Sequence, residues 1–320
     1  MINCKKVFSV LLFLWAISLS LLAQKHRICF YNVENLFDTK HDTLKSDEDF
    51  LPDGIHHWTP HKYWRKLHRI AQTIAALSPQ EGWPTFIGLA EVENDSVLHD
   101  LTKRSTLRAA RYEYFLTESP DERGVNVALL YQPRLFKPLS HWSVRVPSVK
   151  QGFKPTRDIL GVKGILERKD TICLLVVHLP SKAGNKKSGD LNRMLAAQTL
   201  SHAIDSLTGQ KLLVMGDFNA DPRDRIFQHL VPPLHSLMPQ KRKELQKPIG
   251  TYCYKGIWEF LDHILVSSEL WPLIEHRAHV GKWSFLLNER GQPLRTFRGP
   301  ISQDGYSDHL PIYVDMKSSQ

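Results

Sequence analysis

Short runs of strand-forming residues recur along nearly the whole chain. They are RICFYNV, TFIGLAEV, YEYFLT, VNVALLYQ, HWSVRV, DILGVKGIL, TICLLVVHL, KLLVMGD, EFLDHILV and LPIYVD. Several are apolar enough to be buried on both faces of a sheet, whereas HWSVRV alternates as a half-exposed strand does. A sheet must bury its apolar faces against other layers, so the sequence has to supply those layers as well.

Helical patterns are fewer than strand patterns. The clearest is TPHKYWRKLHRIAQTIAAL, in which Thr59 fits the N-cap and Pro60 the first helical position. DSVLHDLTKRS and SGDLNRMLAAQTLSHAIDSL are two further candidates. Many strands with a few long helices predict two packed sheets flanked by helices.

The first 23 residues have the composition of a targeting segment. Lys5 and Lys6 precede an apolar run, residues 7–23, that contains no acidic residue. This is the layout of a secretory signal peptide, and a run of about 17 residues is at the lower limit for crossing a bilayer. We therefore predict a signal peptide over residues 1–23 and export to the periplasm or the cell exterior. An uncleaved membrane anchor is the alternative.

No linker rich in Pro, Gly or Ser divides residues 24–320, which we interpret as one domain. Within it, Cys29, Cys173 and Cys253 are odd in number and have no metal-ligand spacing. Buried free thiols are therefore predicted, with a single disulfide as the alternative.

The chain is basic, with a formal charge of +9 at pH 7. Between Arg134 and Arg157 there are six Lys or Arg residues and no acidic residue. Such a surface attracts phosphate backbones, but it also suits an anionic membrane or simple solubility. Charge alone therefore leaves the partner open.

Polar side chains gather where the strand-like runs end. They are Asn32, Glu34, Glu91, Glu93, His178, Asp217, Asn219, Asp262, His263, Asp308 and His309. A single Asp at a strand end usually makes a turn. The repetition at several ends instead fits a site with oxygen ligands for a divalent cation, and with acid–base groups for phosphoester hydrolysis.

A calcium-binding loop is the competing interpretation of the stretch that starts at Asp217. It begins D-x-N-x-D, as an EF-hand loop does. An EF-hand requires Gly at the sixth position and Glu at the twelfth. Those positions hold Pro222 and Gln228, so this interpretation is excluded.

The motifs FYNVENLFD, GLAEVEN, HLPSK, GDFNAD, LDHIL and SDHLPI, in this order, resemble the endonuclease/exonuclease/phosphatase family. That family includes deoxyribonuclease I, abasic-site endonucleases, inositol-polyphosphate 5-phosphatases and bacterial sphingomyelinases. The resemblance extends from Ile28 to Asp315. It implies an α+β fold, a four-layer αββα sandwich of two mostly antiparallel sheets flanked by helices, with the site at one edge of the sheets.

The resemblance implies a metal-binding group of residues. Asn32 resembles the asparagine that helps to bind phosphate and to position the metal, and Asp308 resembles a second metal carboxylate. Glu91 resembles the metal-binding glutamate, although Ala90 replaces the usual Gln of the L-Q-E motif. Glu93, two positions further on, is the nearby alternative. Mg²⁺ is the expected cofactor, with Mn²⁺ or Ca²⁺ as alternatives.

The resemblance also implies a catalytic group. His178 resembles the histidine that donates to the phosphate or to the leaving oxygen. Asp217 and Asn219 resemble the pair that orients the attacking water. His309 resembles the general base or a phosphate-binding histidine, with Asp262 as its partner. Which of Asp217 and His309 activates water stays open.

Three further cations are weaker candidates for contact with the substrate phosphate. Arg123 precedes a buried strand, Lys182 follows the His178 motif, and Arg193 is near the start of a predicted helix. Each could equally be a solvated surface cation.

The expected activity is metal-assisted attack of water on a phosphodiester, as in a nuclease. A phosphatase or sphingomyelinase-like enzyme, acting on inositol phosphates or lipid head groups, is the alternative, and a non-catalytic binding domain is the remote one. An exposed apolar hairpin within residues 281–299 would favour a lipid substrate, whereas a hairpin paired inside the fold would not. The expected partner is nucleic acid or another phosphoester substrate, with a monomeric protein and no obligate protein partner.

Overall fold

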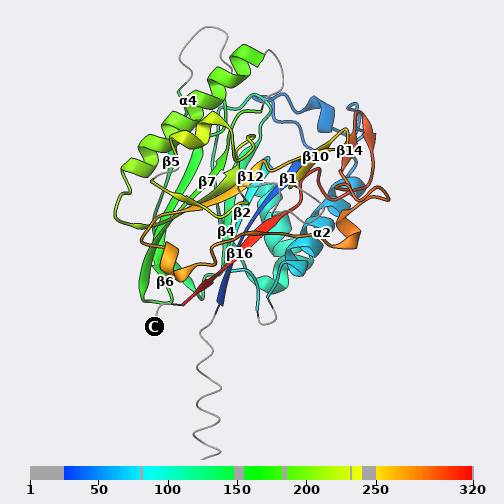
Figure 1. The fold of residues 1–320 in the computed structure, drawn as a ribbon. Helices are drawn as coiled ribbons and strands as arrows, with labels where there is room; N and C mark the ends of the chain where they lie inside the picture. Colours follow the sequence, from blue (N-terminus) through cyan, green and yellow to red (C-terminus); the bar gives the residue numbers. More distant parts are fainter. Residues whose placement is uncertain are drawn as a thin grey trace, which may run out of the picture.

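The structure is a computed structural model. It describes residues 25–79, 82–147, 155–181, 186–230, 233–239 and 250–318. Two six-stranded sheets face each other, and a long helix covers the outer side of each (Figure 1). The predicted αββα sandwich is therefore confirmed. The predicted signal peptide over residues 1–23 lies outside the described residues.

The first sheet has the order β13-β16-β1-β2-β4-β3. Its strands are β1 (Lys25–Leu36), β2 (Phe86–Val92), β3 (Glu113–Leu116), β4 (Asn126–Tyr131), β13 (His279–Val280) and β16 (Ile312–Lys317). Only β1 and β2 pair in parallel, whereas the other neighbours are antiparallel.

The second sheet has the order β5-β6-β7-β8-β12-β9. Its strands are β5 (Phe136–Val144), β6 (Ile159–Leu166), β7 (Asp170–His178), β8 (Lys211–Asp217), β9 (His235–Ser236) and β12 (Asp262–Val266). Here β7 and β8 form the parallel pair, and the remaining pairs are antiparallel. Both sheets are thus mostly antiparallel, as predicted.

Helices and small hairpins complete the described fold. The α-helices are α2 (Pro60–Ala76), α3 (Asp95–His99) and α4 (Lys186–Asp205). Single turns are η1 (Glu48–Phe50), η2 (Asp100–Arg104), η3 (Thr106–Ala110), η4 (Arg225–Gln228), η6 (Trp271–Leu273) and η7 (Ser284–Leu286). Two small hairpins pair β10 (Tyr252–Tyr254) with β11 (Ile257–Glu259), and β14 (Phe297–Arg298) with β15 (Ile301–Ser302).

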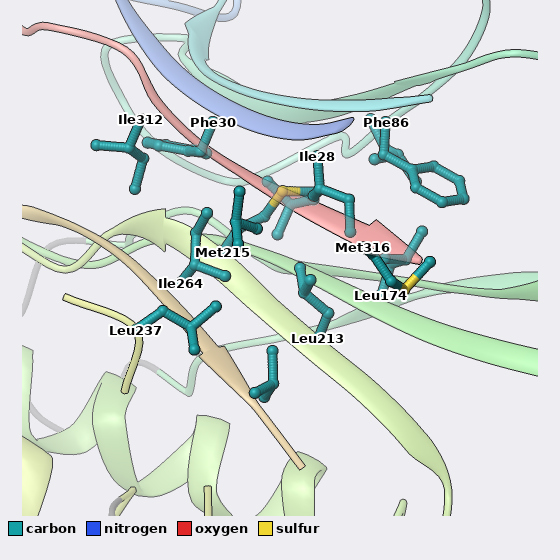
Figure 2. Packing of buried hydrophobic residues seen from close by; sticks show 14 of the residues in the cluster. Ile28, Phe30, Phe86, Leu174, Leu213, Met215, Leu237, Ile264, Ile312 and Met316 are labelled. Atoms are coloured by element: carbon teal, nitrogen blue, oxygen red, sulfur yellow. The ribbon is translucent and has the colours of Figure 1, made fainter. Parts of the chain in front are cut away.

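The apolar core between the two sheets is built from alternate residues of their strands. Ile28 and Phe30 of β1 meet Leu213 and Met215 of β8 in this layer (Figure 2). Tyr31 of β1 belongs instead to the cluster beneath α2, because successive strand residues point to opposite faces. Both faces of these central strands are covered, which explains their nearly continuous apolar runs.

The helix α2 begins where the sequence predicts. Thr59 accepts a hydrogen bond from the Lys62 amide at 3.5 Å, and Pro60 is the first helical residue. Leu67, Ile70 and similarly spaced residues face the first sheet. The second sheet is covered in the same way by α4.

The cysteines agree with the prediction of free thiols. Cys29, Cys173 and Cys253 are unpaired, and the first two are buried. No helix within the described ranges combines the length and the apolar composition that a membrane crossing requires.

The core between the sheets is expected to dominate stability. Leu213 is completely buried there, so Leu213→Ala is expected to lower the free energy of unfolding by about 2–5 kcal/mol. Leu139→Ala is the matched control, because Leu139 is 53% exposed on β5 and such surface changes cost about 0.5 kcal/mol or less. Urea unfolding midpoints compare the two, and equal shifts would contradict the expectation.

Candidate active site

The two parallel strand pairs explain why distant residues meet. Strands β1 and β2 run in the same direction, so Asn32 and Glu91 lie toward the same edge of the first sheet. In the second sheet, β7 and β8 place His178 and Asp217 in direct register. Because β12 is antiparallel to β8, Asp262 begins its strand opposite Asp217.

A bulge redirects the side chain of Glu91. The β1–β2 register shifts between Asn32 and Leu36, and Glu91 has a positive φ of 64°. A bulged strand bends locally and turns a side chain out of the regular alternation. The Glu91 carboxylate accepts a hydrogen bond from the Asn35 amide at 2.9 Å. Glu93 instead accepts from the Asp38 amide at 2.6 Å, so Glu91 is the acid directed to the edge where the strands converge.

Asp217 is the common neighbour of the converging side chains. Its Oδ2 accepts a hydrogen bond from Asn32 Nδ2 at 3.0 Å and lies 3.6 Å from His178 Nε2 and 3.7 Å from His309 Nε2. Its Oδ1 accepts from the Asn219 amide at 2.8 Å. The Asp217 carboxylate is therefore fixed from both sides.

His309 is held by a second carboxylate. Its Nδ1 contacts Asp262 Oδ2 at 2.8 Å, and its backbone amide donates to Ser307 Oγ at 3.0 Å. The Ser307 hydroxyl in turn donates to the Asn32 carbonyl at 2.7 Å. These contacts fix His309, with its Nε2 directed at Asp217.

Burial and neighbouring charges shift the pKa values of the two histidines in opposite directions. Burial lowers the pKa of His309, but the carboxylates of Asp262 and Asp217 outweigh it and raise that pKa well above its usual value. The pKa of His178 lies well below its usual value because of burial and the charges of Arg157 and Arg123. The surroundings therefore favour the cationic form of His309 and the neutral form of His178.

Burial also changes the proton affinity of Asp217. It raises the pKa of this carboxyl to about 7, with the His309 charge acting in the opposite direction and Asp262 adding to the rise. A carboxylate in this range can accept a proton near neutral pH, which an ordinary Asp cannot.

Glu91 and Asp308 bring further negative charge to the site. Burial opposes ionisation of Glu91, but Arg123 and the Asn35 amide lower its pKa overall. Burial raises the pKa of Asp308, and the charge of Glu91 adds to this while His309 opposes it. Their mutual repulsion is the situation that a divalent cation would relieve, and carboxylate oxygens are the ligands that Mg²⁺ prefers.

A second possible metal site shares residues with the catalytic group. One ligand atom each from Asp217, Asp262 and His309 lies within 4.8 Å of the other two, and all three residues are buried. However, the Asp262–His309 contact of 2.8 Å is that of a hydrogen bond and uses the His309 Nδ1. That hydrogen bond would compete with a cation for the His309 Nδ1, whereas Glu91 and Asp308 offer oxygens, the type of ligand that a hard cation prefers.

The weaker candidates have different surroundings. Arg123 lies at the site, where its Nη2 contacts Asn35 Oδ1 at 2.7 Å and Glu91 Oε1 at 3.5 Å. Arg193 is buried and lies 3.8 Å from an oxygen of Asp224. Lys182 falls outside the described residues. The Asn219 side-chain amide donates to the Leu179 carbonyl at 2.9 Å, so it ties the strand ends together.

Two positioning residues were not found from the sequence. Arg157 is buried and donates to the His178 carbonyl at 3.2 Å and to Asp121 Oδ2 at 3.1 Å. Arg295 contacts Asp308 Oδ2 at 2.9 Å and Glu34 Oε1 at 3.6 Å. Neither arginine belongs to one of the motifs, and a position two residues before a strand is the signal in the sequence, before β6 for Arg157 and before β14 for Arg295.

Comparison with known proteins assigns the chain to a family. A sequence profile of the endonuclease/exonuclease/phosphatase family matches residues 27–318. The chain belongs to this family. The search of curated proteins returned no match.

Several solved structures share the fold. An endonuclease/exonuclease/phosphatase family protein from Bacteroides thetaiotaomicron is 15% identical, with a TM-score of 0.57 and coverage of 93% of this chain and 99% of that one. The human Nocturnin catalytic domain is 17% identical, with a TM-score of 0.55 and coverage of 93% and 96%. Danio rerio TDP2, complexed with a single-strand DNA product, is 14% identical, with a TM-score of 0.59 and coverage of 92% and 100%. The protein thus has the phosphoesterase scaffold of this family, with a buried Asp–Asp–His cluster at its sheet edge.

Proposed function

We propose that the protein is an exported, divalent-metal-dependent phosphodiesterase that hydrolyses polynucleotides. The observation that supports this most is the environment of Asp217, a buried carboxylate that lies between a neutral and a cationic histidine. A base beside a cation is what water attack on a phosphodiester requires.

Asp217 is the proposed proton acceptor for the attacking water. Its raised pKa lets it take the proton at neutral pH. The side-chain amide of Asn32 and the backbone amide of Asn219 hold the Asp217 carboxylate in one orientation. His309, whose pKa is raised by Asp262 and Asp217, is then the less suitable base, which favours Asp217 in the choice that the sequence left open.

The two histidines would stabilise the charge that develops on the phosphoryl group. His309 donates to Asp262 through Nδ1, which leaves its cationic Nε2–H for a phosphoryl oxygen. The neutral His178 can donate from Nε2 to a phosphoryl or leaving oxygen. Fixed donors of this kind act without reorganisation during the reaction.

A divalent cation held by Glu91 and Asp308 would polarise a phosphoryl oxygen. Glu91→Gln keeps the shape of the side chain but removes its charge. It is expected to raise the Mg²⁺ concentration that gives half-maximal activity by roughly 10–100-fold, in the range of changes around metal ligands. Metal titration of activity and calorimetry of Mg²⁺ binding measure this. An unchanged Mg²⁺ requirement would assign the metal to other residues.

Polynucleotides are the preferred substrate class for two reasons. The chain carries a formal charge of +9, of which Lys5 and Lys6 of the proposed signal peptide supply two, so an exported protein keeps a positive excess that favours phosphate backbones. A relative of the same fold, TDP2, has a single-strand DNA product bound. Export is proposed from the basic and apolar sequence of residues 1–23.

A substrate panel tests the proposal. The purified protein is incubated with Mg²⁺ and single- or double-stranded DNA, RNA, sphingomyelin or an inositol phosphate, with EDTA as the metal-free control. EDTA-sensitive cleavage of DNA or RNA is expected. If only the lipid or the inositol phosphate is turned over, that compound, and not polynucleotides, represents the substrate class. If none is turned over, the protein is a binding domain.

A further inference from the structure

The small β10–β11 hairpin is joined directly to the catalytic residues. The Thr251 carbonyl accepts from the Leu310 amide at 2.7 Å, and the Thr251 hydroxyl accepts from the Asp262 amide at 3.3 Å. Tyr252 forms a β-bridge with His309, and the two rings lie 5.0 Å apart. The hairpin therefore begins at the reacting centre.

One face of the hairpin continues outward from His309. Tyr252 and Tyr254 are two positions apart on β10, so they share a face. Ile257 is the cross-strand partner of Tyr254 and lies on that same face. The step from Tyr252 to Tyr254 is about 7 Å along a strand. The outer pair is therefore one short step from the His309 ring.

The outer part of this face is exposed and apolar. Tyr254 is 52% and Ile257 is 64% exposed, whereas Tyr252 is partly buried. Lys255 and Gly256 at the turn both have positive φ, 49° and 81°. These values fit the tight two-residue turn whose twist matches that of the flanking strands. The side chains of Tyr254 and Ile257 are therefore held on a short, defined hairpin.

The Lys255 ammonium adds a cation beside the aromatic ring. Its Nζ lies 5.3 Å from the centre of the Tyr254 ring. An exposed aromatic ring with an adjacent cation suits a ligand that has a flat face and a neighbouring negative charge. A nucleobase attached to its own phosphate has both features.

We propose that Tyr254 and Ile257 form a base-stacking subsite that holds the nucleobase next to the scissile phosphate. This inference rests on the proposed hydrolysis of polynucleotides. A lipid surface is the less favoured ligand, because two side chains offer little apolar area for insertion into a membrane. The subsite would make cleavage depend on the presence of a base, with tolerance for which base it is.

Two oligonucleotides separate base stacking from phosphate binding. One is a single-stranded thymidine octamer, and the other has the same sugar-phosphate backbone with abasic residues throughout. In the double variant Tyr254→Ala/Ile257→Ala, kcat/KM for the thymidine octamer is expected to fall by about 5- to 100-fold, which corresponds to the loss of stacking on one base. The kcat/KM for the abasic octamer should stay unchanged. Tyr254→Phe should retain cleavage, because it keeps the ring, and Leu139→Ala on exposed β5 is the surface control.

Other outcomes would overturn the inference. An equal loss on both octamers, or no loss on either, means that the hairpin does not recognise bases. If the wild-type protein cleaves neither octamer, binding of both octamers in EDTA decides about the subsite. The proposed function fails only if the DNA and RNA of the substrate panel are not cleaved either. A preference for the thymidine octamer that disappears in the double variant supports it. Absence of that preference, or binding to anionic vesicles that requires Tyr254, rejects it.

Discussion

An Asp217→Asn variant is expected to lose about 10²–10⁴-fold in kcat, because the proposed proton acceptor for the attacking water is removed. Asparagine has the same size and can still accept the hydrogen bond from Asn32, so the site should keep its shape. The raised pKa of Asp217 arises chiefly from burial, which Asn tolerates without ionising. The variant should therefore be folded and inactive, as measured by circular dichroism and by turnover with Mg²⁺.

Asp221→Asn provides the matched control. Asp221 follows Asp217 by four residues and contacts Arg223 at 2.9 Å on the surface of the loop. Its replacement makes the same chemical change outside the site, so activity should remain within about twofold, as for a surface substitution. If folded Asp217→Asn turned over substrate at the wild-type rate, another group would have to activate the water.

The sequence predicts the layers of this fold because each central strand is buried on both faces. Runs such as RICFYNV and KLLVMGD became β1 and β8, with residues on both sides packed into clusters. The long helices were equally predictable, since Thr59 and Pro60 mark the start of α2. These are local patterns, and local patterns are what a single sequence reveals.

The segment 281–299 is less regular than a predicted hairpin. It contains the turn η7 and one isolated bridge between Leu287 and Pro293. Leu286 is buried and Trp283 packs against the cluster beneath α2, so the segment belongs to the fold. Such a segment gains its conformation from distant partners, which no local pattern records.

The same limit applies to the residues around the site. The motifs predict which side chains carry the chemistry, but the direction of the Glu91 side chain depends on a bulge and on the Asn35 amide. Arg295 reaches Asp308 and Glu34 from a loop with no motif. Long-range charge pairs of this kind depend on the folded arrangement of the sheets and loops, and only the structure shows them.

His309 and Asp262 are expected to act as one unit. His309→Gln should lower kcat by about 10²–10⁴-fold, since it removes the cation proposed to face the phosphate, and Asp262→Asn by about 10–10²-fold. The double variant should lose no more than His309→Gln alone, because Asp262 acts through His309. His202→Gln, on the exposed side of α4, should have little effect.

The pH profile distinguishes this coupling from a loss of structure. If the protonated form of His309 is required, activity falls as the pH rises through the His309 pKa. The Asp262 carboxylate raises that pKa, so Asp262→Asn lowers it and moves the alkaline limb of kcat to lower pH. A merely destabilised enzyme would lose activity without such a displacement. An alkaline limb that stays in place, or losses that multiply in the double variant, would show that Asp262 does not act by sustaining the charge on His309.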